Sequence, residues 1–161
     1  MLKIFNNLEP FFEDVFREIS VREYGQLRWV SPPTASSILK ELEKENLLLR
    51  KQRRIYLFFR ANREFSLFQD LARAYWRSKL IKELEPLIKQ TLYKKSILFG
   101  SISKVENSIN SDIDLFISIP KREIDLKQIE KKLNRKIQIH FQDSLKNLNL
   151  KKNIGEGITI K

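Results

Sequence analysis

The chain has 161 residues, and it contains no cysteine, one histidine, four glycines and five prolines. The lack of cysteine excludes disulfides, thiolate nucleophiles and cysteine-based zinc sites, and a single histidine excludes a histidine metal cluster. So few glycines and prolines leave little room for long flexible linkers. No apolar run is long enough to span a bilayer, and the first residues lack a signal peptide's apolar stretch. We therefore expect a soluble, cytoplasmic protein with no membrane partner.

Charged residues are plentiful and unequal in sign. The chain has 31 lysines and arginines against 20 aspartates and glutamates, which gives a formal net charge of +11. An excess of this size is typical of proteins that bind a polyanion such as nucleic acid. Because the excess is spread evenly along the chain, the local arrangement of the residues has to identify the partner.

The first part of the chain, residues 1–63, predicts a series of short elements. Apolar spacing indicates a helix over 4–18, a short strand over 19–21 and a second helix over 22–29 that buries Tyr24, Leu27 and Trp29. A third helix begins after the predicted N-cap Ser31 and ends near Asn46. Two strands over 47–50 and 55–59 follow, joined by a basic turn over 51–54.

This order of elements is the plan of a winged helix-turn-helix, and residues 31–48 resemble the recognition helix and following strand of that class of regulators. The resemblance implies that double-stranded DNA is the partner. Short polar side chains of the third helix would reach base edges in the major groove, namely Thr34, Ser36, Ser37 and Lys40. The wing would neutralise phosphates through Arg50, Lys51, Arg53 and Arg54. The alternative is that these four cations form only a solvated turn.

Residues 64–93 predict a helical connector, because apolar side chains recur at helical spacing throughout. Pro86 interrupts this pattern, so we expect two helices or a kink near Glu85. Its aromatic residues are interpreted as core or as the interface of a homodimer.

A chemical motif follows in the last part of the chain. The apolar strand 96–99 leads into Gly100 and Ser101, and a ten-residue spacer separates them from Asp112 and Asp114 on a second apolar strand. Strand residues two apart share a face, so the two carboxylates converge as Mg²⁺ ligands. A glycine lets the backbone approach a phosphate, and the serine adds a hydroxyl at the start of a helix. We predict a site for a Mg²⁺–nucleoside triphosphate (NTP), with the aspartates as metal-binding and catalytic residues and Gly100 and Ser101 as nucleotide-binding residues.

Residues 90–161 resemble the minimal nucleotidyltransferases of the polymerase-beta-like superfamily, through Phe99-Gly100-Ser101 and Ser111–Ile117. The resemblance implies a small mixed sheet and a third carboxylate on the next strand, expected over 136–141. Gln138 occupies the position of that acid, and an amide is a weak, neutral ligand that cannot act as a general base. His140 on the same face is a second candidate base, with a structural role as the alternative.

We therefore predict an α+β protein with a winged helix-turn-helix at 1–63, a helical connector at 64–93 and a small mixed-sheet nucleotidyltransferase fold at 94–161. The leading hypothesis is a DNA-binding, transcriptional regulatory protein whose C-terminal domain binds Mg²⁺ and nucleotide. The alternative is an active enzyme that transfers NMP from NTP to a protein, RNA or small-molecule acceptor. A further alternative, implied by the resemblance, is an antitoxin-like partner of a helical ribonuclease toxin. Slow transfer, nucleotide sensing and a vestigial site all stay open.

Overall fold

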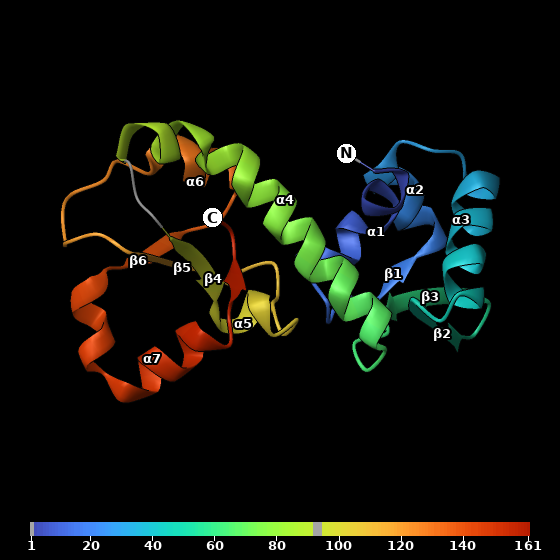
Figure 1. Ribbon diagram of the computed structural model, residues 1–161. Coiled ribbons are helices and arrows are strands. Elements are labelled where there is room, and N and C mark those ends of the chain that lie inside the picture. The colour runs from blue at the N-terminus through green and yellow to red at the C-terminus, as the bar shows by residue number, and fades with distance from the viewer. Residues whose placement is uncertain (1, 92–94) are drawn as a thin grey trace. The chain divides into compact units, whose positions relative to one another are not determined.

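The computed structural model describes the backbone of residues 2–91 and 95–161 and the side chains of residues 2–85 and 95–161 (Figure 1). The chain divides into two compact units. The first comprises Met1–Ala72 and Asn107–Ile109, and the second comprises Arg73–Glu106 and Asn110–Lys161. The long helix α4 (Ser66–Thr91) contributes residues to both units. In the part of the chain that is described, no helix is both long and apolar enough to cross a membrane.

The first unit contains three helices and an antiparallel sheet before α4. The elements are α1 (Lys3–Glu13), β1 (Ile19–Ser20), α2 (Val21–Arg28), α3 (Pro32–Lys44), β2 (Leu48–Arg53) and β3 (Tyr56–Ala61). The sheet has the order β1-β3-β2. Its core consists of fully buried side chains from every helix and from β3, including Phe11, Phe12, Tyr24, Leu39, Phe59 and Phe68.

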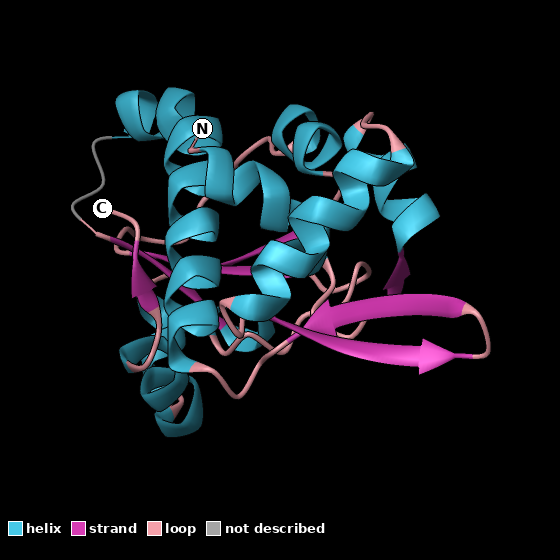
Figure 2. Ribbon diagram, turned by 90° about the vertical axis from the view of Figure 1, so that its right-hand side faces the viewer, coloured by secondary structure: helices cyan, strands magenta, loops and turns pink. Residues whose placement is uncertain are grey.

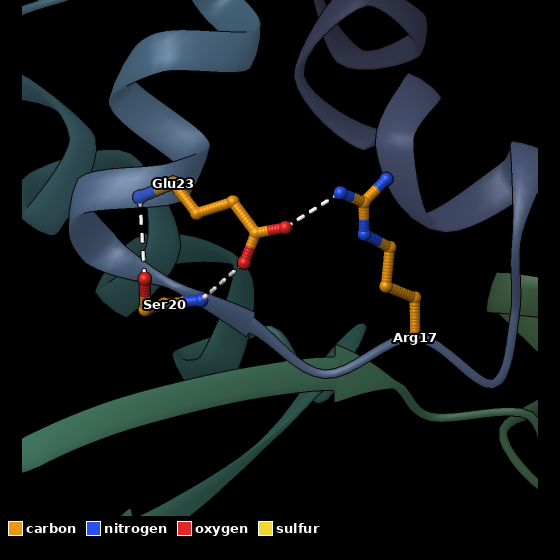
Figure 3. A network of polar contacts seen from close by, with 3 residues as sticks. All are labelled: Arg17, Ser20 and Glu23. Atoms are coloured by element: carbon orange, nitrogen blue, oxygen red, sulfur yellow. Dashed lines mark hydrogen bonds and ion pairs between the residues drawn. The ribbon is translucent and has the colours of Figure 1, made fainter.

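Local side-chain caps fix where α2 and α3 begin. The Ser20 hydroxyl accepts a hydrogen bond from the Glu23 backbone N–H (3.2 Å), and the Glu23 carboxylate accepts one from the Ser20 N–H (3.4 Å) and one from Arg17 (2.6 Å) (Figure 3). This reciprocal capping box turns the chain directly from β1 into α2. The predicted N-cap Ser31 is confirmed, because its hydroxyl accepts a hydrogen bond from the Thr34 N–H (3.4 Å).

Helix α1 is shorter than predicted, and two side chains at the end of α2 are more exposed than predicted. Helix α1 ends at Glu13 rather than at residue 18, and the Asp14 carboxylate accepts a hydrogen bond from the Phe16 N–H (3.0 Å) in place of a helical carbonyl. The predictions that Leu27 and Trp29 are buried are wrong, since these side chains are 39% and 94% exposed. Trp29 caps α2 with a left-handed backbone, which turns its side chain outward.

The hairpin is longer than predicted and its turn is shorter. Pairing of Arg53 with Tyr56 leaves only Arg54 and Ile55 in the turn, so the predicted turn over 51–54 is wrong. Arg54 takes the positive φ of 54° that so tight a connection requires. Figure 2 shows β2 and β3 as a long ribbon that ends at this turn.

One buried amide in the first unit comes from a distant part of the sequence. The Asn107 side chain is 1% exposed and donates hydrogen bonds to the Phe12 (2.8 Å) and Glu13 (3.1 Å) carbonyls at the end of α1. Asn107 thus supplies hydrogen-bond donors to carbonyls at the C-terminus of that helix.

The second unit is a mixed sheet with helices. Its elements after α4 are β4 (Ser96–Phe99), α5 (Gly100–Ser103), β5 (Ile113–Ile117), α6 (Lys127–Leu133), β6 (Ile137–His140), the 3₁₀ helix η1 (Gln142–Lys146), α7 (Leu148–Gly155) and β7 (Ile158–Thr159). The strand order is β6-β5-β4-β7, with β5 and β6 parallel and the other pairs antiparallel. The predicted α+β class with a mixed C-terminal sheet is therefore confirmed.

Helices lie on both faces of this sheet. Figure 1 shows α6 and the second part of α4 on one side and α7 on the other. On the α7 side, Ile97, Phe99, Phe116 and Ile154 form a buried cluster. Strand register places Asp114 opposite Phe99, so the Asp114 side chain projects from the same face as this cluster.

The connector differs in part from its prediction. A single helix, α4, spans the region where two helices were expected, while the expected kink near Glu85 stays a prediction, because the side chains from residue 86 to 94 lie outside the described residues. In the tail, the 3₁₀ helix η1 is followed by α7. Asn147 starts α7 by accepting a hydrogen bond from the Leu150 N–H (3.1 Å).

Candidate functional site

Gly100 lies at the junction of β4 and α5, against a carboxylate of the neighbouring strand. Its φ of +76° is one that residues with a side chain rarely adopt. A Cβ atom at this position would overlap the Asp114 carboxylate, with Asp114 Oδ2 as its nearest neighbour. Glycine is thus required on two independent grounds, and its absent side chain leaves the backbone beside Asp114 accessible.

The two aspartates of the motif lie at the start of β5 and are both half-buried. Burial raises the pKa of Asp114 above its ordinary value; the His140 imidazole opposes this rise in pKa and the Asp112 carboxylate adds to it. The two carboxylates therefore repel one another, and a cation between them would relieve this repulsion.

Gln138 and His140 lie on β6, on the face predicted from the sequence. The parallel register places Gln138 opposite Asp114 and His140 opposite Phe116. The Gln138 amide donates a 2.6 Å hydrogen bond from Nε2 to Asp112 Oδ2. His140 Nε2 lies 3.8 Å from Asp114 Oδ1, and its ring meets the Phe99 ring edge-on at 5.1 Å between centroids. All four polar side chains of the motif and its neighbouring strand thus gather in one cluster.

Ser101 is the second residue of α5, which has only four residues. The Gly100 carbonyl accepts hydrogen bonds from the Ser103 hydroxyl (2.9 Å) and the Lys104 N–H (3.2 Å), which closes this single turn. A helix with so few aligned peptide groups has only a weak dipole. Any hydrogen bond from the half-buried Ser101 to a ligand would therefore come from its own hydroxyl or backbone N–H.

The donor set of this cluster decides which metal it suits. Within the described ranges, no three or more His, Cys, Asp or Glu side chains are grouped so as to hold a metal ion by themselves. Mg²⁺ commonly takes one or two carboxylates and completes its shell with water and substrate phosphates. Asp112 and Asp114 therefore fit a Mg²⁺ ion that arrives with a phosphate, and they do not fit an ion caged by protein alone.

Comparison with protein families assigns this part of the chain. The family model described as "Nucleotidyltransferase domain" matches residues 77–159, just over half of the chain. The chain belongs to the nucleotidyltransferase domain family. The matched residues begin within α4 and end in β7. They include all four residues of the polar cluster, Asp112, Asp114, Gln138 and His140. No curated protein matches the chain.

Outside the nucleotidyltransferase domain, the cations predicted to form one wing cluster are divided between two faces of β2. Strand side chains alternate, so Arg50 points toward α3, where its Nε lies 3.1 Å from Glu43 Oε1. Lys51 and Arg53 point to the other face, and both contact Glu18. Arg54 lies exposed in the turn. Three of the four predicted cations thus have a carboxylate partner in the same unit.

The polar residues predicted on the third helix mostly face outward. Thr34, Ser37 and Lys40 are exposed, whereas Ser36 is half-buried beside the buried Ala35. The sequence analysis missed Glu18, which is 33 residues from Lys51 and has no local pattern that could link the two. The exposure of Trp29 was also not predicted.

Proposed function

We propose that the nucleotidyltransferase domain binds a Mg²⁺–nucleoside triphosphate, and that the first unit binds double-stranded DNA as a winged helix-turn-helix. The chain would then be a transcriptional regulatory protein that carries a nucleotide site. One observation supports the nucleotide part above all others: Gly100, with a positive φ and no room for a Cβ, lies against Asp114, whose pKa the Asp112 carboxylate helps to raise.

In this proposal each residue of the cluster has one task. Asp112 and Asp114 hold the Mg²⁺, which supplies positive charge to the triphosphate. Gly100 lets a phosphate approach the backbone, and the Ser101 hydroxyl donates a hydrogen bond to a phosphate oxygen.

Gln138 favours binding over turnover. Its amide already donates a hydrogen bond to Asp112, which satisfies that carboxylate without a further charge. A neutral amide cannot accept the proton of an attacking hydroxyl. We therefore infer that the domain binds nucleotide and transfers it slowly or not at all.

His140 favours the second candidate function, active nucleotidyl transfer to a protein, RNA or small molecule. In that reaction an acceptor oxygen forms a bond to the α-phosphorus while the bond from phosphorus to the bridging oxygen breaks, and pyrophosphate leaves. The imidazole lies 3.8 Å from Asp114 and can take the acceptor's proton. If the missing third carboxylate limits transfer, Gln138→Glu will increase the incorporation of label from an α-labelled NTP.

The nucleotide part is tested by thermal unfolding with each NTP, with and without Mg²⁺. A ligand at 100 times its dissociation constant stabilises a fold by about 2.7 kcal/mol, which is a readily measured shift. Asp112→Asn/Asp114→Asn should abolish the Mg²⁺-dependent shift, while the exposed control Asp143→Asn should keep it. Absence of a shift with all four nucleotides in the wild type would refute nucleotide binding.

The DNA part rests on the order of α2, α3 and the β2–β3 hairpin, with exposed Thr34, Ser37 and Lys40 on α3 and Arg54 at the turn. Fluorescence anisotropy with a labelled duplex tests it. Arg53→Ala/Arg54→Ala should weaken binding and reduce its salt dependence, because the wing loses two positive charges. The control Lys121→Ala/Arg122→Ala removes the same charge from exposed residues of the second unit and should bind as the wild type does. Equal losses in both variants would refute a specific role for the wing.

A further inference from the structure

We propose that Glu18 competes internally with DNA phosphates for the wing cations and so limits the affinity of the first unit for DNA. This inference rests on the proposed function, because it concerns the regulation of the same interface. Glu18 directly precedes β1 and contacts two cations of β2. These cations, Lys51 and Arg53, are two of the four that were predicted from the sequence to neutralise DNA phosphates.

The geometry gives each carboxylate oxygen of Glu18 its own cation. Oε1 lies 3.3 Å from Lys51 Nζ, and Oε2 lies 2.5 Å from Arg53 Nη2. The Glu18 side chain is 23% exposed, whereas both cations are 54% exposed. The carboxylate is therefore the sheltered partner, and the cations are the partners that a phosphate can reach.

Backbone pairing holds this arrangement in place. Ile19 pairs with Phe59 and Ser20 with Phe58, which fixes the residue before them beside the hairpin. The Arg53 guanidinium also lies over the Phe58 ring, 5.4 Å from its centroid. The sheet register thus places the Glu18 backbone beside the cations of β2.

Competition follows from the chemistry of the donors. The ammonium and guanidinium groups that would bind DNA phosphates already donate to Glu18, and an unpaired Glu18 would repel a nearby phosphate. Exposed ion pairs are each worth about 1.5- to 5-fold in an equilibrium constant. Breaking both pairs therefore costs DNA binding about 2- to 30-fold in affinity.

The test is the affinity of the full chain for a labelled duplex, measured by anisotropy at several salt concentrations. Glu18→Gln should bind about 2- to 30-fold more tightly than the wild type. Its slope of log Kd against log salt should be steeper by up to about 1.8, since two more cations become available to phosphates. The matched control Glu45→Gln makes the same change in net charge at an exposed residue that ends α3, and it should have a much smaller effect.

A mutant cycle links the gain to the two cations. In the Lys51→Ala/Arg53→Ala background, Glu18→Gln should improve binding no more than Glu45→Gln does, with far-UV circular dichroism confirming that each variant is folded. The inference is overturned if Glu18→Gln binds as the wild type or more weakly, if Glu45→Gln gains as much, or if the gain persists without the two cations. A wild type that binds no duplex overturns the proposed DNA function together with this inference, whereas a binding wild type with an unchanged Glu18→Gln overturns this inference alone.

Discussion

Replacing Gly100 with alanine should destabilise the second unit substantially. At a φ of +76° an alanine pays about 1–2 kcal/mol for the left-handed backbone. The added Cβ also meets the Asp114 carboxylate, Cγ and Cβ, the last at 3.3 Å, so the Asp114 side chain has to move away from the positions that its carboxylate and Cγ occupy. Forced overpacking of this kind costs about 1–3 kcal/mol. The expected loss in free energy of unfolding is about 2–5 kcal/mol.

Guanidinium denaturation measures this loss in the second unit through Trp76, which is fully buried there. Gly155→Ala is the matched control, because a Cβ at this last residue of α7 would meet nothing within 4 Å. That variant should be neutral or more stable by up to about 1 kcal/mol. A Gly100→Ala protein whose unfolding midpoint equals that of the control would refute the reasoning.

A double-mutant cycle separates the two causes. In an Asp114→Ala background the carboxylate and Cγ are absent. Gly100→Ala should then destabilise the fold only through the left-handed backbone and the remaining contact with Cβ. The coupling energy between the two positions should therefore be about 1–2 kcal/mol and should favour the double mutant. Strictly additive losses would show that the positive φ alone requires glycine.

Three further predictions concern single side chains. Burial raises the pKa of Tyr24 to about 12, against an ordinary value of 10.0, so the first unit should lose about 2 kcal/mol of stability as the pH rises from 10 to 12, and Tyr24→Phe should not. Asn107→Ala leaves the carbonyls of Phe12 and Glu13 without their donor and should cost about 2–4 kcal/mol in chemical denaturation. Because the pKa of Asp114 is raised, its charged form destabilises the fold above that pKa. Asp114→Asn should therefore unfold at a higher temperature at neutral pH, by a margin that shrinks as the pH falls toward 3.8.

Each of these predictions has a control in the chain. Tyr56 is 60% exposed, so Tyr56→Phe should leave the alkaline loss of stability unchanged. The exposed Asn110 serves as the control for Asn107, and Asn110→Ala should be neutral. Asp143→Asn should show no pH-dependent gain. A stability gain in Asp114→Asn that is constant with pH, or an alkaline loss that persists in Tyr24→Phe, would contradict the corresponding argument.

Local signals explain what the sequence predicted correctly. Ser31 followed by two prolines is a strong helix start, and the structure has α3 there. The apolar run 96–99 before a glycine and the apolar alternation after Asp112 each specify a short buried strand, and β4 and β5 lie at those positions. These features need only neighbouring residues, so they can be recognised without knowing the fold.

Such local signals do not predict pairing between segments that are distant in the sequence. The run Arg50–Arg54 has a high density of cations, which favoured a turn, yet hydrogen bonds to β3 extend β2 through Arg53. Once these residues are in a strand, alternation sends them to opposite faces, and their partners Glu43 and Glu18 come from two different elements. A cationic cluster in sequence is therefore a weak predictor of a cationic patch in space.

For Gln138, the sequence predicts the position of the residue, but its interactions can be identified only from the structure. The alternation of β6 predicted that it faces the aspartates, but only the strand register shows that it lies opposite Asp114 and bonds to Asp112. A glutamate at this position would place a third negative charge beside Asp112 and Asp114, where the Asp112 carboxylate already contributes to the raised pKa of Asp114, so the cluster would require a cation. The amide instead donates a hydrogen bond to Asp112 and adds no charge to the cluster. Gln138 thus satisfies one oxygen of Asp112 within the protein, where a glutamate would add to the repulsion between carboxylates.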